Sequence, residues 1–137
     1  MASYKLWGIL GEIGKKILTH EDGLQRKLGL SEAEYRGLQS IEEGEKITCQ
    51  EFSRRMGLSV SRGSRVVDRL CNKNFIERVD CQSDRRCKNI WLTKKGLLIR
   101  QTIKREIQKW GNALTVDYTE KKLGQLRSDL KKIADML

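Results

Sequence analysis

Three charged residues, Asp84, Arg85 and Arg86, stand together between two short runs rich in β-branched and aromatic side chains. The runs, residues 75–80 and 87–92, are typical of strands, so the sequence predicts a β-hairpin with this triplet at its tip. An arginine on a narrow projection can enter the minor groove of duplex DNA, where the negative potential is enhanced. A neighbouring carboxylate can accept hydrogen bonds from an arginine and fix its direction. The alternative interpretation is a solvent-exposed turn rich in charges.

Two short helices are predicted directly before the hairpin. The first runs from a capping box at residues 48–51 to about Met56, Gly57 supplies a turn, and Ser59 caps the second helix, which runs to about Asn72. In a helix-turn-helix the second helix lies in the major groove and presents its N-terminal residues to base edges. Its exposed face is expected to carry Ser61, Arg62 and Arg65, and its interior face Val66, Val67 and Leu70. The alternative is a surface helix with solvated arginines.

The charge distribution favours the first interpretation. The 137 residues carry a net charge of +10, and residues 50–100 contain 13 lysines and arginines against five acidic residues. Most of the positive excess therefore falls on the predicted helix-turn-helix and hairpin, and a clustered excess of this kind attracts phosphates and releases their counterions. A basic surface kept only for solubility would suit a scattered distribution better.

The remaining sequence predicts helices on either side of this region. An amphipathic helix starts near the N-terminus, residues 20–29 are ambiguous because Gly23 interrupts the pattern, and a capping box at residues 31–34 starts a second helix. Lys46 and Ile47 are a very short strand candidate. Thr93 and Thr119 can cap two long C-terminal helices whose apolar stripes suit a core or a subunit interface. The expected fold class is mainly α with a small β-hairpin wing.

The chain resembles the MarR family of bacterial and archaeal transcriptional regulators. The resemblance covers nearly the whole chain and keeps the order of its elements. It is carried by residues 28–31 (LGLS), 57–59 (GLS), 66–70 (VVDRL), 76–79 (IERV), 84–86 (DRR) and 92–96 (LTKKG). Gly63 departs from the family pattern, which has a small or branched apolar residue there. Asn74 stands where glycine is usual, and asparagine also tolerates a left-handed helix end.

The resemblance implies one MarR-like domain over residues 1–137, with a winged helix-turn-helix at about 31–96 and dimerisation helices at about 1–28 and 97–137. It implies a homodimer on a pseudo-palindromic operator, usually acting as a repressor, with Arg86 as the wing arginine and Asp84 as its orienting acid. An effector would act by changing the spacing of the two recognition helices. The candidate DNA-binding residues are Ser59, Ser61, Arg62, Ser64, Arg65, Arg69, Asp84, Arg85, Arg86 and Lys88.

The four cysteines, Cys49, Cys71, Cys81 and Cys87, all lie in the predicted DNA-binding half. Cys49 is expected in the first turn of a helix, where the helix dipole stabilises a thiolate. Cys81 and Cys87 flank the hairpin tip and could approach one another. Four thiolates could bind zinc or an iron–sulfur cluster, or switch by oxidation, but no C-x-x-C pair is present. Cytosolic thiols also often only fill space.

Relatives of this family often bind small aromatic ligands between the dimerisation helices and the winged part, and Trp7, Tyr35 and Trp110 could line such a cleft. Aromatic residues at helical spacing also often form plain core. No apolar run approaches the roughly 20 residues that cross a bilayer, and the N-terminus lacks a secretory layout, so a cytoplasmic protein is expected. No glycine-rich phosphate loop, Ser/His/Asp set or HExxH motif is present, which argues against an enzyme. The alternative function is non-specific architectural DNA binding.

Overall fold

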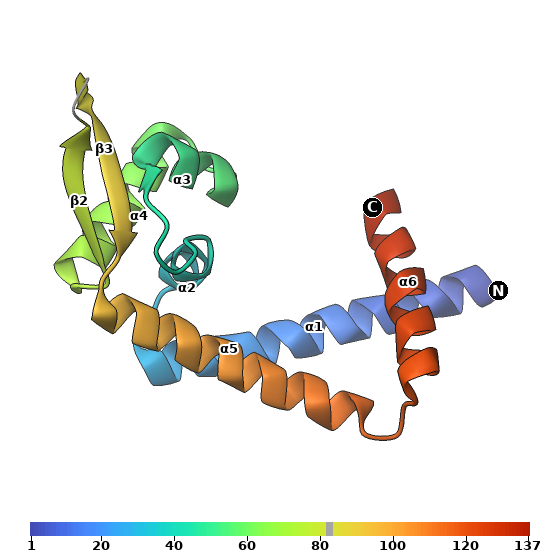
Figure 1. The fold of residues 1–137 in the computed structure, drawn as a ribbon. Coiled ribbons are helices and arrows are strands. Elements are labelled where there is room, and N and C mark those ends of the chain that lie inside the picture. The colour runs from blue at the N-terminus through green and yellow to red at the C-terminus, as the bar shows by residue number, and fades with distance from the viewer. Residues whose placement is uncertain (82–83) are drawn as a thin grey trace. The chain divides into compact units, whose positions relative to one another are not determined.

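The computed structural model describes the backbone of residues 1–81 and 84–137, and the side chains of residues 1–80 and 88–137. It is mostly helical with one small antiparallel sheet, as the sequence predicted (Figure 1). The elements are α1 (Ala2–Leu28), α2 (Glu32–Gln39), β1 (Ile47–Thr48), α3 (Cys49–Met56), α4 (Val60–Asn72), β2 (Ile76–Cys81), β3 (Asp84–Leu92), α5 (Lys94–Thr115) and α6 (Glu120–Met136).

Hydroxyl side chains begin five of the helices, at the positions that the sequence predicted. Each hydroxyl accepts a hydrogen bond from the backbone N–H three residues later, and thus satisfies a donor that the first turn of a helix leaves free. The caps and their N···O distances are Ser31 (3.2 Å), Thr48 (3.0 Å), Ser59 (3.2 Å), Thr93 (3.0 Å) and Thr119 (3.2 Å).

Helix α1 resolves the ambiguous stretch at residues 20–29. It continues through Gly23 to Leu28 and ends at Gly29, whose φ of 68° lies in the left-handed region. Leu24 and Gln25 are buried, so the packing of this last third of the helix outweighs the weak helix propensity of Gly23. Nearer the N-terminus, by contrast, the apolar side chains of one face of α1 are exposed: Leu6, Ile9, Ile13 and Ile17.

The sheet has the strand order β1-β3-β2, with β2 and β3 forming the predicted hairpin beside α4 (Figure 1). Ile90 of β3 pairs with Ile47 of β1 and with Arg78 of β2, so β3 is the central strand. The side chain of Ile90 is fully buried. The other fully or almost fully buried apolar residues include Leu38, Ile41, Phe52, Val66, Val67, Leu70 and Ile76. This core fixes α2, α3, α4 and the base of the hairpin as one body.

The chain divides into two compact units, residues 1–101 and 102–137. The first unit contains α1 to β3 and the start of α5, and the second contains the rest of α5 and α6. In the second unit Leu114, Leu126 and Leu130 are exposed. Among the described helices, none is both long enough and apolar enough to cross a membrane.

Candidate nucleic-acid interface

Helices α3 and α4 form a helix-turn-helix with a tight connection. Gly57 ends α3 with φ 66°, a left-handed conformation that glycine adopts without a steric penalty. The N–H of Gly57 donates to the carbonyl of Arg54, and the N–H of Leu58 donates to the carbonyl of Ser53. These two hydrogen bonds satisfy two of the carbonyls that the end of α3 leaves free, and Ser59 then begins α4. The turn therefore holds α4 at a fixed angle to α3.

Helix α4 has one buried face and one solvent face, as its sequence predicted. Val66, Val67 and Leu70 are buried against the core. The solvent face is chemically different because it carries polar and basic side chains that are open to a partner. Its exposed residues are Ser59, Ser61, Arg62, Arg65 and Arg69, whereas Ser64 is half-buried. Arginine side chains on such a face can hold a guanine edge through two hydrogen bonds, and serine hydroxyls can contact phosphates.

Gly63 sits where α4 crosses α3. It is buried, and a Cβ atom there would lie 1.8 Å from the Ser53 hydroxyl oxygen and 2.7 Å from the Ser53 Cβ. No side chain fits this space. The sequence marks this glycine as a departure from the pattern of the family that it resembles, and the packing gives the reason, because the missing side chain is what lets the two helices touch.

The hydroxyl of Ser59 already has a role at the start of α4. It accepts the hydrogen bond from the N–H of Arg62, and it lies 3.3 Å from the hydroxyl oxygen of Ser61. Both residues are exposed. The N-terminus of α4 therefore offers free N–H groups and a hydroxyl to an anion, which is the arrangement that favours a phosphate.

Two ion pairs hold the hairpin. Arg78 of β2 pairs with Asp68 of α4, and Lys88 of β3 pairs with Asp80 across the hairpin. The first pair joins the hairpin to α4. The second engages the ammonium group of Lys88, which the sequence proposed as a DNA contact.

Towards the tip, the backbone register pairs Cys81 with Asp84, after a shift of register that follows Asp80. The side chains of Asp84, Arg85 and Arg86, which the sequence proposed as DNA contacts, lie outside the described residues. Their proposed roles stay predictions.

Cys49 and Cys71 are the two cysteines whose side chains the structure describes, and burial raises the pKa of each thiol. Cys49 is the first residue of α3, as expected, but burial raises the pKa of its thiol, and the nearby Arg78 does not offset this. Burial likewise raises the pKa of the Cys71 thiol. The expected stabilisation of a Cys49 thiolate is therefore wrong, because desolvation of the charged form outweighs the helix dipole.

No group of three potential metal-ligating side chains is present among the described residues. The side chains of Cys81 and Cys87 lie outside them, so the expected zinc or iron–sulfur site and the expected approach of these two thiols stay predictions. Cys49 and Cys71 are half-buried free thiols.

The three aromatic residues proposed for a ligand cleft have different environments. Tyr35 is buried in α2, and both burial and the Glu21 carboxylate raise the pKa of its phenol. Trp7 is 64% exposed on α1. Trp110 is half-buried and belongs to the second unit. The cleft therefore stays a prediction.

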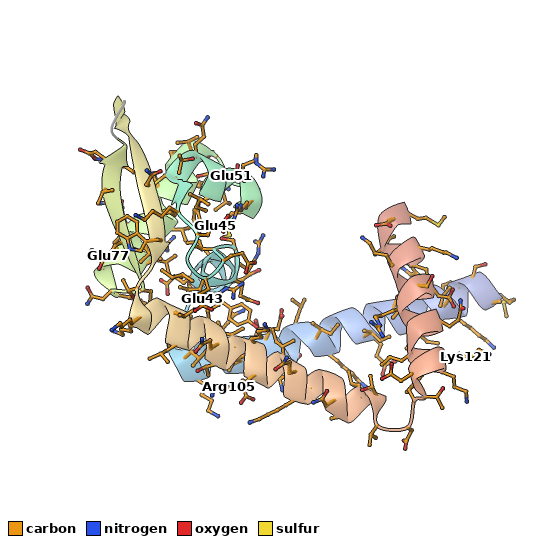
Figure 2. All side chains as sticks on the ribbon, viewed as in Figure 1. Glu43, Glu45, Glu51, Glu77, Arg105 and Lys121 are labelled. Atoms are coloured by element: carbon orange, nitrogen blue, oxygen red, sulfur yellow. The ribbon has the colours of Figure 1, made fainter. Side chains whose placement is uncertain are left out.

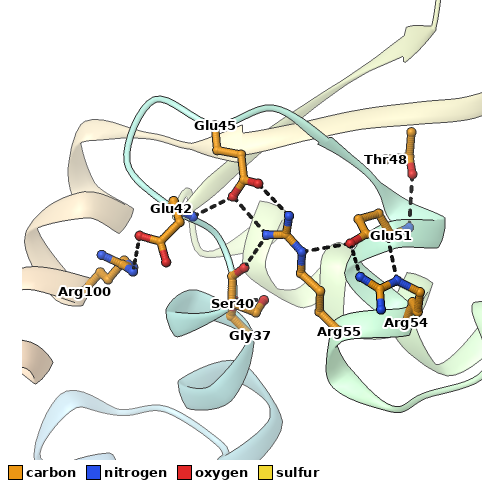
Figure 3. A network of polar contacts seen from close by, with 9 residues as sticks. All are labelled: Gly37, Ser40, Glu42, Glu45, Thr48, Glu51, Arg54, Arg55 and Arg100. Carbon is orange, nitrogen blue, oxygen red and sulfur yellow. Dashed lines mark hydrogen bonds and ion pairs between the residues drawn. The ribbon is translucent and has the colours of Figure 1, made fainter.

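Sequence reasoning missed a polar network around α3. Arg55 binds both oxygens of Glu45 in the α2–β1 loop, and it also binds Glu51 one turn earlier on its own helix (Figure 3). Arg54 binds Glu51 with N···O distances of 2.6 and 2.8 Å. Hydrogen bonds from the arginines hold the pKa of Glu45 and of Glu51 at about 2. Figure 2 shows both glutamates on the part of the first unit that contains α3.

Sequence reasoning also missed a hollow beside the turn between α3 and α4. The hollow lies where the first turns of α3 meet the start of α4, and Gln50, Arg54 and Val60 help to line it. Gln50 and Arg54 are exposed. The first helix of a helix-turn-helix crosses the DNA backbone, which is the signal that would have identified these two residues.

Comparison with known proteins gives consistent matches. The family model described as MarR family matches residues 30–88. The transcriptional repressor MprA of Escherichia coli K12 is 31% identical over 83 residues, which are 59% of this chain and 47% of that protein. The chain thus spans about half the length of the curated relatives it matches.

Two solved structures have the same fold. Streptococcus pneumoniae FabT in complex with DNA has a TM-score of 0.84 and 23% identity, covering 96% of this chain and 94% of that one. The apo form of wild-type MarR from Escherichia coli has a TM-score of 0.74 and 24% identity, covering 93% and 95%. At these identities the two likenesses show the fold alone.

Proposed function

We propose that this chain, whose residues 30–88 match the model of the MarR family, is a sequence-specific, duplex-DNA-binding transcriptional regulator. The observation that carries this proposal is the division of α4 into two faces. Val66, Val67 and Leu70 are buried while Arg62 and Arg65 are exposed, so the helix presents basic side chains on a rigid support. The fold shared with FabT, which was solved in complex with DNA, supports the same role.

In this proposal α4 enters the major groove, and the N-terminus of α4 binds a phosphate near Ser59 and Ser61. The first helix, α3, crosses the backbone and places Gln50 and Arg54 next to another phosphate. The wing reaches the adjacent minor groove, where Arg86 is the inserted side chain, Asp84 orients it, and Arg85 neutralises phosphate. The Lys88 ammonium group would leave Asp80 to bind a DNA phosphate, or would bind both at once.

The regulator would act as a homodimer. The first unit leaves the apolar face of α1 exposed, with Leu6, Ile9, Ile13 and Ile17, and the second unit leaves Leu126 and Leu130 of α6 exposed. A patch of exposed apolar side chains of this kind marks a surface at which a protein binds a partner. Two-fold dimers are the most common oligomers. Two copies would place two recognition helices on half-sites about 34–36 Å apart along one face of the DNA.

We further propose that the protein acts in the cytoplasm as a repressor without catalytic activity, and that a small ligand, a metal or a thiol redox change releases it from its operator. The relative MprA is a transcriptional repressor, which supports this direction of regulation. To release the protein, an effector needs only to bind the dimer more tightly at one spacing of the two recognition helices than at another.

Selection from a pool of random duplexes tests this function. We expect the recovered sequences to share two inverted half-sites separated by about one helical turn, since two identical readers related by a two-fold axis require such an arrangement. Arg62→Ala should relax the preference at one base pair of each half-site, and Arg86→Ala should weaken binding to every sequence alike. Recovery of no common sequence, with equal affinity for all duplexes, would indicate the alternative function of an architectural DNA-binding protein.

A further inference from the structure

The loop between α2 and β1, residues 40–46, is held on one side by Arg55 of α3. One terminal nitrogen of Arg55 lies 2.8 Å from the Ser40 carbonyl oxygen and 2.9 Å from one carboxylate oxygen of Glu45, and the other lies 2.5 Å from the second oxygen (Figure 3). The Nε atom of Arg55 lies 3.1 Å from Glu51. The planar guanidinium thus fixes both ends of the loop to α3 in one geometry.

The same loop is held from the opposite side by α5. Arg100 donates to the carboxylate of Glu42 at 2.9 Å, and the backbone N–H of Glu42 donates to Glu45 at 2.9 Å (Figure 3). Every step from α5 to α3 is therefore a direct contact, in the order Arg100, Glu42, Glu45, Arg55. All four residues belong to the first unit, and α5 itself continues into the second.

We propose that this network couples α5 to the helix-turn-helix, with Arg55 as the positioning residue that transmits a shift of α5 to α3 and hence to the recognition helix. The inference rests on the proposed function for its biological meaning, but the coupling itself is a property of the chain alone. Two of its side chains, Arg55 and Glu45, are only 28% and 27% exposed, so water and salt compete for them less than for an isolated surface pair.

The path from α3 to α4 is stiff, which is why a small displacement would reach the DNA-facing residues. Gly63 packs directly on Ser53 in α3, with no room for a methyl group between the helices. A rotation of α3 therefore carries α4 with it. Close-packed elements of this kind change by discrete shifts, and they do not absorb a displacement gradually.

Hydrogen exchange of the free protein tests the coupling without DNA. Glu42→Gln removes the carboxylate that Arg100 binds, and Glu43→Gln is the matched control because the neighbouring carboxylate is outside the network. We expect the α3 amides of residues 50–56 to exchange roughly two- to five-fold faster in Glu42→Gln than in the wild type. An increase of this size is expected when a partly exposed ion pair is lost. The same amides should keep the wild-type rate in Glu43→Gln. Equal rates in the two variants would overturn the proposal.

A double-mutant cycle tests the effect on DNA, with the duplex recovered by selection as the probe. Glu42→Gln and Arg55→Gln should each weaken binding about two- to five-fold, and the double variant should bind no worse than Arg55→Gln alone, because both break the same path. Additive losses would overturn the proposal. Arg36→Gln, which removes a different contact to α3, at the Met56 carbonyl, should combine additively with Glu42→Gln. Failure of the wild type to bind any duplex would reject the proposed function and leave the exchange result as the test of the coupling.

Discussion

Gly63 and Ser53 lie in contact at the crossing of α4 and α3, and the space between them is too small for a single added methyl group. The crossing distance of a helix-turn-helix determines how far the second helix projects, so this contact sets the position of the exposed face of α4. The residue type at position 63 is therefore dictated by packing, although the residue belongs to the helix that we propose to read DNA.

Substitution Gly63→Ala should destabilise the protein. The new Cβ would overlap the Ser53 hydroxyl and its Cβ, so the helices must separate, and overpacking of this kind costs about 1–3 kcal/mol. Gly23→Ala is the control, because that helical glycine has no neighbour within 4 Å, and alanine there should stabilise by roughly 0.5–1 kcal/mol. Urea unfolding measures both. A Gly63→Ala protein as stable as the wild type would show that the crossing is loose.

Asn74 is the one described non-glycine residue with a positive φ, 62°. Substitution Asn74→Ala should lower the free energy of unfolding by about 1 kcal/mol, because the left-handed conformation costs a residue with an ordinary Cβ roughly 1–2 kcal/mol. Asn74→Gly should leave the stability within about 0.5 kcal/mol, because glycine relieves the strain but increases the entropy of the unfolded chain. If alanine and glycine give equal stabilities, backbone strain is not what position 74 controls.

Glu34 has a side chain only 5% exposed, and it binds Lys73 at 2.6 Å. Burial raises the pKa of Glu34, but hydrogen bonds from Lys73 and from the Ser31 N–H outweigh it, so the net pKa lies below its ordinary value. The folded protein therefore gains stability from this carboxylate above its ordinary pKa and loses it as the pH falls. Lys73→Met removes the hydrogen bond and the charge by which Lys73 lowers this pKa, so the variant should lose less stability than the wild type as the pH falls.

At neutral pH we expect Lys73→Met to cost about 1–3 kcal/mol, less than a fully buried pair because Lys73 is 39% exposed. Lys16→Met breaks the exposed pair with Glu12 and should cost less than about 0.5 kcal/mol. Unfolding in urea between pH 7 and pH 4 tests both the size and the sign. A stability difference between Lys73→Met and the wild type that widens on acidification would contradict the account.

The network at Arg55 predicts a different pH window. Glu45 and Glu51 have pKa values of about 2 against an ordinary 4.5, because Arg55 and, for Glu51, Arg54 donate hydrogen bonds to their carboxylates. The stability that Arg55 supplies is complete above pH 4.5 and is lost as the pH falls towards 2. The difference in free energy of unfolding between the wild type and Arg55→Gln should therefore be constant above pH 4.5 and should become smaller below that pH. Added salt should also reduce this difference. A difference that does not change between pH 6 and pH 2.5 would show that the loss is not electrostatic.

The elements and their ends could be predicted from the sequence because they depend on local chemistry. Hydroxyl caps at Ser31, Thr48 and Ser59, and asparagine at position 74, act within a few residues of themselves. Contacts between residues that lie far apart in the sequence could not be predicted. Arg55 binds Ser40 and Glu45, 15 and 10 residues away, and nothing in the spacing indicates that partnership.

Errors arose where burial decides the chemistry. The first-turn position of Cys49 was predicted correctly, but its thiol pKa depends on the sheet and helix packed around it, which no local pattern reports. The packing role of Gly63 could not be predicted for the same reason, because the neighbour that excludes a side chain lies on another helix.

An equilibrium titration of the selected duplex, compared with a scrambled duplex of equal composition, decides whether two copies of this chain read a specific sequence. At about 150 mM salt we expect the selected duplex to saturate at two chains and to bind at least about 10³-fold more tightly than the scrambled one. Equal affinity for the two duplexes, or saturation at a single chain, would show that the chain is not a dimeric, sequence-specific DNA-binding protein.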